Sequence, residues 1–354
     1  MSTVYLESGQ DRLYGWEEVS IHYSMDAIAA TYDLTFSEEA KDHETLEDIS
    51  LKLGDPIKIR LDNDLVLTGW QEEILVDYGA DRHDISANGR SLTGDLVECP
   101  LDVNGQQNKQ YKKQKFDAIA KELCAPFGVE VVVDEGVDLG DPLTQTIDEG
   151  QTIHEFLNQL ARYRGLRLTS DFDGRLHITK PGIYRTETVL KLGENIKRGS
   201  GRFSTRQVFS SYTILSQLSG FGAEAGPDVV ARQKGRELEE VLKGRHRPFV
   251  AVSDRSSSSG ECQSRAKFEQ RTRNGRAQAV TYVYQGWKDE QGLLWRINTV
   301  VPVYDSWMGI QGDRLISGVR YIDSDDGLIV EITVMPLSSF DMRIESEKQE
   351  EKFF

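Results

Sequence analysis

The sequence has few cysteines, no long apolar run and no signal-peptide pattern in its first residues. Cys99, Cys124 and Cys262 are an odd number at wide spacing, without a C-x-x-C pair or a histidine cluster. This pattern indicates reduced, structural thiols and excludes both a disulfide framework and a zinc site. No apolar stretch approaches the roughly 20 residues that span a bilayer, so we expect no stable membrane insertion. The first residues lack the basic start and apolar core of a signal peptide, so we expect the chain to be made and retained in the cytoplasm.

Complete signatures of catalysis or cofactor binding are also missing. His154 and Glu155 adjoin on a predicted helix, but no second histidine follows four residues away, which favours a helix-start or surface histidine over a zinc ligand. Gly220, Gly222 and Gly226 lack the dinucleotide-binding spacing and a strand-to-helix setting, so they predict a mobile loop. The Walker lysine motif is absent. We therefore assign no catalytic residue, no cofactor and no metal ligand.

Three further clusters of polar residues are better explained by structure than by chemistry. The serines at 256–259 lack a fixed base and predict a loop. The Asp-rich segments 171–174 and 323–327 begin like calcium loops, but neither has the distal glutamate, so both predict hairpin turns. The lysines within 109–115 favour a solvated lead-in to a helix over a nucleic-acid contact.

The length and the composition point to several folded domains. At 354 residues the chain exceeds the size at which a single core usually stops growing. Its hydrophobic content of 38%, with 13 Tyr, 13 Phe and 5 Trp, excludes wholesale disorder. A globular protein with two or three cores is therefore expected.

The net charge of −16 is distributed unevenly along the chain. Residues 1–100 hold 22 acidic and 7 basic residues, whereas residues 201–300 hold 10 acidic and 16 basic residues. An acidic first domain repels nucleic-acid phosphates, and a basic block can meet an acidic partner or a neighbouring subunit. A solubilising surface explains the N-terminal acids equally well.

One hairpin-rich β pattern occurs near both ends of the chain, with its strands in the same order. The first occurrence covers residues 55–61, 74–78 and 83–89, and the second covers 299–304, 315–322 and 328–336. A true duplication would let one polypeptide present two similar wall segments, so that a ring of a few subunits matches a partner of twice its symmetry. Any two antiparallel meanders look alike in sequence, however, so chance similarity also explains the pattern.

The regions between these patterns predict a mixed fold. Alternating residues at 13–36 add early strands to the first pattern, which suggests a small barrel or sandwich. Residues 116–124 and 153–163 show helical apolar stripes, a short strand is expected at 129–133, and a hairpin is expected at 166–179. Farther on, we expect long loops at 219–227 and 254–260, a basic helix near 261–273, and strands at 277–287, 293–304 and 314–336.

These elements define a fold class and a domain map. The predicted class is α+β, mainly β, with two similar tube-like antiparallel β-barrel domains flanking a smaller helix-plus-strand module. The predicted domains are a first barrel at 1–97, the α+β middle module at 98–182, a second barrel with long loops at 183–340, and a charged tail at 341–354.

Several short motifs occur in a specific order along the chain. In the middle module the motifs are FDAIA at 116–120, FGV at 127–129, DEGQTIHEFL at 148–157, LARYRG at 160–165 and LHI at 176–178. In the second barrel they are RHRPF at 245–249, RAKFE at 265–269, GW at 286–287, GLLW at 292–295 and LISGV at 315–319. Their order resembles the baseplate hub proteins of Mu-like contractile-tailed bacteriophages and, more distantly, the VgrG spike proteins of type VI secretion. The resemblance covers nearly the whole chain.

The resemblance implies a homotrimeric virion protein of the tail baseplate, assembled in the cytoplasm of the bacterial host. Each subunit would supply two barrels to a pseudo-sixfold ring between a hexameric tail tube and a trimeric central spike. Its partners would be further copies of itself, the tube protein, the spike protein and other baseplate proteins, and DNA would pass without specific binding. Since no needle-like segment follows the second barrel, a separate polypeptide is expected to supply the spike.

Two other functions stay open from the sequence. One is a VgrG-like secretion component, which would need effector-loading or spike segments. The other is a tail-associated glycan hydrolase that uses a pair of carboxylates, because acidic residues are plentiful. No cell-wall-cleaving segment is recognisable in the sequence, which disfavours the hydrolase. Under the hub hypothesis, the acidic residues of the N-terminal block would line a channel that avoids binding DNA phosphates.

Overall fold

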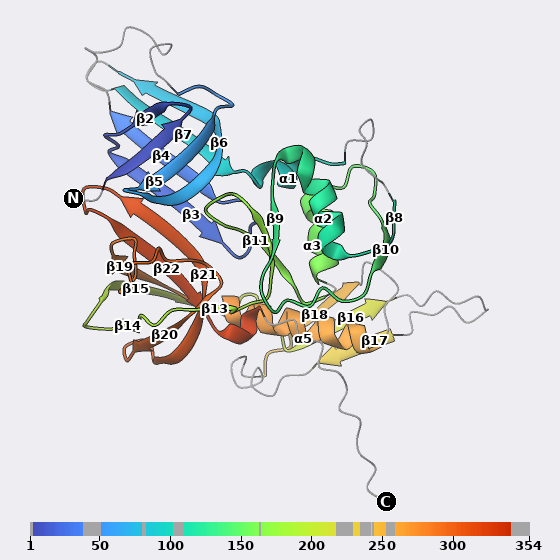
Figure 1. Cartoon of the computed structure of the whole chain (residues 1–354). Helices are drawn as coiled ribbons and strands as arrows, with labels where there is room; N and C mark the ends of the chain where they lie inside the picture. The colour runs from blue at the N-terminus through green and yellow to red at the C-terminus, as the bar shows by residue number, and fades with distance from the viewer. Residues whose placement is uncertain are drawn as a thin grey trace, which may run out of the picture. The chain divides into compact units, whose positions relative to one another are not determined.

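A computed structural model of the chain (Figure 1) describes residues 3–37, 51–79, 83–101, 110–162, 164–216, 229–233, 242, 244–252 and 259–340. The chain forms two compact units, one made of residues 1–199 with 281–334 and one made of 200–280 with 335–354. Every helix in the described ranges is too short or too polar to cross a bilayer. The domain boundaries expected at residues 97 and 182 stay predictions.

A large, mostly antiparallel sheet dominates the fold, which confirms the predicted α+β, mainly β class (Figure 1). Its strands follow the order β15-β19-β22-β21-β3-β4-β7-β6-β5-β1-β2, and β20 joins β21 while β13 and β14 pair with β20. The strands from the N-terminal part are β1 (Val4–Ser8), β2 (Asp11–Leu13), β3 (Glu18–Ser24), β4 (Thr31–Ser37), β5 (Pro56–Leu61), β6 (Asp64–Tyr78) and β7 (His83–Ser91). The others are β13 (Tyr184–Arg185), β14 (Leu190–Lys191), β15 (Ile196–Phe203), β19 (Gln278–Gln285), β20 (Thr299–Asp305), β21 (Ile310–Asp323) and β22 (Ile329–Met335).

The two predicted meanders are β5-β6-β7 and β20-β21-β22, and their strand order is the same, as predicted. Each has a long middle strand, of 15 residues in β6 and 14 residues in β21. The first part of each middle strand pairs with the strand before it, β5 or β20. Between the meanders lie β3 and β4, with β21 paired to β3 and β4 paired to β7. Whether the meanders are duplicates stays a prediction.

A bulge bends the first meander where β6 meets β7. The pairing register shifts between Gln71 and Glu73. Gly69 allows a close approach of the two strands there, because a Cβ atom at this position would lie 2.0 Å from the carbonyl oxygen of Arg90. The Tyr32 hydroxyl donates a hydrogen bond to Gln71 Oε1 at 2.7 Å and holds the residue that precedes the bulged Glu72. Such bulges increase the local twist and curvature of a sheet.

The middle module has its own hydrophobic core, built mainly from two helices (Figure 1). The predicted helix at 116–124 is α2 (Phe116–Cys124), and the helix predicted from 153 is α3 (Ile153–Arg162). Thr152 and Glu155 form a capping box, since Glu155 N donates to Thr152 Oγ1 at 3.2 Å and Thr152 N donates to Glu155 Oε2 at 3.1 Å. The remaining elements are α1 (Gly94–Glu98), β8 (Gln110–Gln114), the 3-10 turn η2 (Ala125–Phe127), β9 (Val131–Val133), β10 (Leu143–Thr146), β11 (Arg167–Ser170) and β12 (Leu176–Thr179).

Three local predictions are wrong. Residues 110–114 form strand β8 and not a solvated lead-in, because wholly buried Tyr111 stacks on Phe156 of α3. The strand expected at 293–304 begins only at Thr299, because Asp289 holds the preceding residues in a turn. Ser259, expected in a loop, starts helix α5. For β8 a contact distant in sequence overrides the local pattern, whereas the late start of β20 follows from local hydrogen bonds to Asp289.

The second unit contains a small sheet and one long helix. Strands β16 (Ser211–Ser216), β17 (Val229–Gln233) and β18 (Pro248–Val252) lie in the order β17-β16-β18. Helix α5 (Ser259–Arg276) packs on β16 and β17 and contributes Cys262 and Ala266 to the core, and η3 (Leu337–Ser339) is a short 3-10 turn. The Arg273 guanidinium lies 4.4 Å from the centre of the Phe249 ring. The predicted basic helix near 261–273 is confirmed.

Candidate functional site

The large sheet carries a charged groove of about 650 Å³ on one face. Side chains of β3, β4, β6 and β7 line one part of it, and side chains of β19, β21 and β22 line the other. The ionisable side chains in its wall are the carboxylates Asp33, Glu72, Glu73 and Glu331, the guanidiniums of Arg90 and Arg320, and the imidazole of His22. The groove therefore crosses the place where β3 pairs with β21 of the second meander, which we call the seam. Its wall has more acidic than basic groups.

Side chains along β3 and β21 point alternately to the two faces of the sheet. One face carries the groove, and the other is buried. His22 and Arg320 are direct cross-strand partners, and both line the groove. Their sequence neighbours Tyr23 and Tyr321 are buried. Burial, together with the nearby Arg320, lowers the pKa of His22, so this imidazole is neutral near pH 7. The Arg320 guanidinium also donates to Ser20 Oγ at 2.8 Å.

Arg90 organises the acidic residues at the first meander. Its Nε and Nη2 atoms donate to the two carboxylate oxygens of Glu72 at 2.7 and 2.9 Å. Its Nη1 atom donates to Glu98 Oε1 at 2.7 Å. These hydrogen bonds raise the pKa of Arg90 and lower the pKa of Glu98. Planar, bidentate pairing of this kind holds both side chains in one orientation.

The tip of the β11-β12 hairpin supports the opposite, buried face of the seam. Phe172 lies edge-on to Tyr23 of β3 and to Tyr321 of β21, with ring centres 5.5 and 6.3 Å apart. The Arg296 guanidinium lies 4.8 Å from the centre of the Phe172 ring. Phe172 of the middle module thus contacts both β3 and β21, the two strands that pair at the seam.

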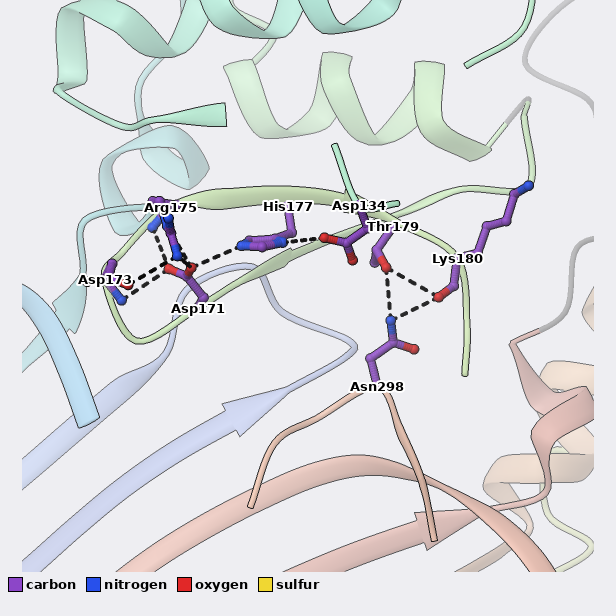
Figure 2. Close-up of polar contacts among 8 residues, drawn as sticks. All are labelled: Asp134, Asp171, Asp173, Arg175, His177, Thr179, Lys180 and Asn298. Carbon is purple, nitrogen blue, oxygen red and sulfur yellow. Dashed lines mark hydrogen bonds and ion pairs between the residues drawn. The ribbon is translucent and has the colours of Figure 1, made fainter. Parts of the chain in front are cut away.

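A partly buried charge network fixes the hairpin that carries Phe172 (Figure 2). His177 Nδ1 lies 2.6 Å from Asp134 Oδ1, and its Nε2 lies 3.0 Å from Asp171 Oδ2. Arg175 donates to Asp171 Oδ2 at 2.8 Å and to Asp173 Oδ2 at 3.1 Å. Burial alone would lower the pKa of His177, but the hydrogen bonds to Asp134 and Asp171 outweigh it and raise the pKa to about 9.

The same interactions keep Asp171 ionised. Burial would raise its pKa, but the hydrogen bonds from His177 and Arg175 lower it to about 2. At neutral pH the histidine is therefore a cation between two carboxylates. Both ring nitrogens carry protons, which leaves no lone pair for abstracting a proton or binding a metal.

Asn298 joins this hairpin to the start of β20 (Figure 2). Its amide donates to Thr179 Oγ1 at 3.0 Å and to the Lys180 carbonyl at 2.9 Å, and its oxygen accepts from Gly182 N at 2.7 Å. The residue is buried and has a positive φ of 62°, a conformation that asparagine tolerates better than most residues. The middle module is thus hydrogen-bonded to the strand that begins the second meander.

The other residues that the sequence singled out do not converge on this site. His154 lies on α3, where burial lowers its pKa, and Glu155 belongs to the capping box. Segments 171–174 and 323–327 are hairpin turns, as interpreted. The residues from Gly220 to Gly226 and the serines 256–258 lie outside the described residues. Within the described ranges, no group of three or more His, Cys, Asp or Glu residues is placed to hold a metal ion.

Sequence reasoning missed the His177 network and the Asn298 contacts. Two features were available: a histidine within an apolar strand at 176–179, and an aspartate directly after the valines 131–133. Neither feature reveals a partner, because Asp134 lies 43 residues from His177. Only the parallel pairing of β9 with β12 brings them together.

Comparisons with known proteins agree with this architecture along the chain. A family described as "Mu phage baseplate assembly protein GpP-like, N-terminal" matches residues 3–91. "Baseplate hub protein gp44-like, second domain" matches 93–180, and "Mu phage baseplate assembly protein GpP, fourth domain" matches 258–343. The fold, with its two meanders and intervening module, is therefore that of a structural protein of phage tails.

Individual relatives extend over the whole chain. Baseplate hub protein gp44 of Escherichia phage Mu is 28% identical over 99% of this chain and 92% of its own length. The 43 kDa tail protein of prophage MuSo2 from Shewanella oneidensis is 31% identical, with a TM-score of 0.85 over 96% of this chain and 99% of that one. One chain of the Francisella PdpA-VgrG complex is 10% identical, with a match covering 96% of this chain and 59% of that one, and its TM-score of 0.58 shows a shared fold alone.

The chain belongs to the baseplate hub family of Mu-like phages, as its motif order indicated. It has a structural role in the tail baseplate of the virion.

Proposed function

We propose that three copies of this chain form a pseudo-sixfold ring that connects the hexameric tail tube to the trimeric central spike. The observation that carries the proposal is the presence of two meanders with the same strand order in one sheet. Three chains then offer six similar wall segments to the tube while keeping threefold symmetry toward the spike.

The charged groove lines the channel through which DNA leaves the virion. Its wall has four carboxylates against two guanidiniums, and Arg90 is already bound to Glu72. Such a surface repels phosphates and avoids the salt-dependent binding that basic walls produce. Weak contact lets DNA pass through during genome ejection.

The role of the chain is mechanical and not catalytic. The partly buried network around His177 holds the middle module against the seam, and its imidazolium is not available as a base. The partners are further copies of the chain, the tube protein, the spike protein and other baseplate proteins. Cleavage of peptidoglycan by the purified chain would contradict this part of the proposal.

The ring is tested by measuring the mass of the purified chain with light scattering and its shape with electron microscopy. Both measurements are made alone and with purified tube and spike proteins. We expect an annular particle of three chains that binds the tube on one side and the spike on the other. A monomeric, non-annular particle under all of these conditions would overturn the proposal.

The channel is tested by reversing charge in the groove. The double variant Glu73→Lys with Glu331→Lys removes two acidic groups from the wall and adds two bases. We expect it to gain DNA affinity that falls steeply with salt, and to slow genome release from assembled particles. The matched control is Glu130→Lys with Glu135→Lys, which makes the same charge change at exposed positions of the middle module. Equal effects of the two variants on genome release would contradict a channel-lining groove.

A further inference from the structure

Trp307 is a large apolar side chain in an unusually exposed position. It lies in the turn between β20 and β21 and is 88% exposed, the highest value for a large hydrophobic residue in the described part of the chain. Tryptophan is enriched among the residues that dominate binding at protein interfaces. Its exposure makes it a candidate residue for an interface.

The turn that presents Trp307 is fixed by hydrogen bonds. The buried Asp305 carboxylate accepts from Trp307 N at 2.9 Å and from Met308 N at 3.1 Å through Oδ1. Its Oδ2 atom accepts from the buried Tyr282 hydroxyl at 3.0 Å. A partner that covers the indole therefore does not have to order this part of the backbone, which lowers the entropic cost of binding.

The surroundings of Trp307 are apolar at the centre and basic at the edge. Tyr304 and Leu192 are also exposed, and they are neighbours because Leu192 N donates to the Tyr304 carbonyl at 3.0 Å. β15 passes beside the turn, since a Cβ atom at Gly199 would lie 3.1 Å from Met308 Cε. The exposed bases near this turn are Lys191 on β14, which pairs with Glu194, and Lys197 and Arg198 on β15, of which Arg198 lies 3.4 Å from Glu331.

A groove elsewhere in the same unit has complementary properties. It has a volume of about 740 Å³, and Tyr184, Leu293 and Trp295 form part of its apolar wall. Leu293 is 65% exposed there, and the buried Trp295 Nε1 atom has no hydrogen-bond partner. The acidic residues in its wall outnumber the basic ones and comprise Asp64, Asp173, Glu187 and Asp289, against Arg185 and Arg296.

The projecting indole and this groove lie at opposite ends of one strand. Thr299, at the start of β20, lines the groove, and Asp305, at its end, adjoins the turn. At roughly 3.3 Å per residue these positions are roughly 20 Å apart, so Trp307 does not reach the groove of its own chain. A contact between this indole and this groove therefore requires two copies of the chain.

We propose that Trp307 of one copy inserts into the groove lined by Leu293 and Tyr184 of the next copy. Basic residues around the indole then face the acidic wall of the groove. Such a head-to-tail contact uses two different patches, and repeated around an axis it closes a ring. The inference rests on the proposed ring and names the surfaces that close it.

The two meanders supply the two sides of this contact. Asp64 and Leu65 of the groove wall directly follow the turn between β5 and β6 in the first meander. Trp307 lies in the corresponding turn between β20 and β21 of the second meander. The first meander of one copy thus meets the second meander of its neighbour, so that the two types of wall segment alternate around the ring.

The test measures self-association of the full chain by analytical ultracentrifugation. Trp307→Ala removes the indole, and Leu293→Arg blocks the groove with a basic side chain. We expect each to raise the dissociation constant of self-association by roughly 30-fold or more, the scale of an interface hot spot. The control is Leu53→Ala, a truncation at another exposed apolar residue, which should leave association unchanged. Circular dichroism verifies that every variant is folded.

Mixing the two variants makes the test specific for a head-to-tail contact. The Leu293→Arg chain keeps an intact indole, and the Trp307→Ala chain keeps an intact groove. An equimolar mixture should therefore form heterodimers that do not grow further, whereas each variant alone stays monomeric. Trp307→Phe, which keeps an aromatic ring, should restore part of the association.

The outcomes separate this inference from the proposed function. If the wild type forms rings and Trp307→Ala forms them equally well, the Trp307 contact is wrong and the hub ring stands. If Trp307→Ala forms rings but no longer binds the tube protein, Trp307 contacts the tube and the inference is overturned. A wild type that never associates, alone or with tube and spike, overturns the proposed ring itself.

Discussion

The turn between β5 and β6 and the turn between β20 and β21 occupy corresponding places in the two meanders, but the chain uses them differently. The first is tied to its own chain, because Asp62 Oδ1 accepts from Thr3 N at 2.8 Å and Asp64 lies 2.5 Å from Lys288 Nζ. The second presents Trp307 to solvent on a hydrogen-bonded turn. Equivalent strands therefore do not make equivalent surfaces. In our proposal this difference makes the contact between neighbouring copies head-to-tail.

The comparison predicts that contacts at the seam determine the free energy of unfolding. The turns of the meanders determine how copies of the chain associate. Substitutions at the seam should change the free energy of unfolding strongly. Substitutions in the turns should affect association and leave unfolding nearly unchanged.

The largest effect on unfolding is expected for Phe172→Ala. The ring is buried between Tyr23 and Tyr321, and its removal leaves a cavity at the seam. We expect the free energy of unfolding to fall by about 3 kcal/mol in denaturant titrations. Leu75→Ala, at a half-exposed position of β6, is the control and should cost less than about 1 kcal/mol. Equal losses would show that the hairpin tip does not support the seam.

The second effect is a pH dependence that His177 produces. Its pKa is raised to about 9 from an ordinary value of 6.5, so its stabilising contribution is complete below pH 6.5 and is lost as the pH rises through 9. We expect wild-type stability to fall by on the order of 2 kcal/mol between pH 6.5 and 9. In His177→Gln this alkaline slope should be absent, and stability near pH 6 should be lower.

The matched control for this pH dependence is His154→Gln. Burial lowers the pKa of His154, so this residue opposes folding only as the pH falls below 6.5. The alkaline slope should therefore persist in that variant. An unchanged slope in His177→Gln would contradict the assignment of the network.

A smaller effect is expected for Arg90→Lys. Lysine keeps the charge but does not reproduce the paired hydrogen bonds to Glu72. We expect thermal denaturation to show a loss of about 1 kcal/mol, because the Arg90 side chain is only partly exposed. Arg198→Lys, whose partner Glu331 is 3.4 Å away from an exposed guanidinium, should show no measurable loss.

The smallest effect is expected for Lys288→Ala, which removes the ion pair with Asp64 beside the first turn. Both side chains are about one-third to one-half exposed, so the free energy of unfolding should change by about 0.3 kcal/mol. A loss above about 1 kcal/mol in denaturant titrations would show that this turn contributes to stability as the seam does.

The sequence predicted elements well wherever a local pattern and a local stop signal coincide. Helix α2 has the bounds expected from its apolar stripe before Pro126, and α3 starts at Ile153, as its apolar stripe indicated. Strand β8 was missed because its polar sequence gives no alternation, and burial of Tyr111 against Phe156 decides its structure. The order of the meander strands was predictable because turn residues separate alternating runs.

What the sequence by itself determined is the set of helices and strands, the order of the meanders and the family. These follow from periodic burial and turn chemistry, which are written in neighbouring residues. The tertiary structure decided the groove at the seam, the protonation of His177 and the exposure of Trp307. Each depends on distances between residues that are far apart in the chain, such as Asp134 and His177 or Asp305 and Tyr282. A side chain's charge state and its freedom to contact a partner are set by what folds around it, and no local pattern contains that information.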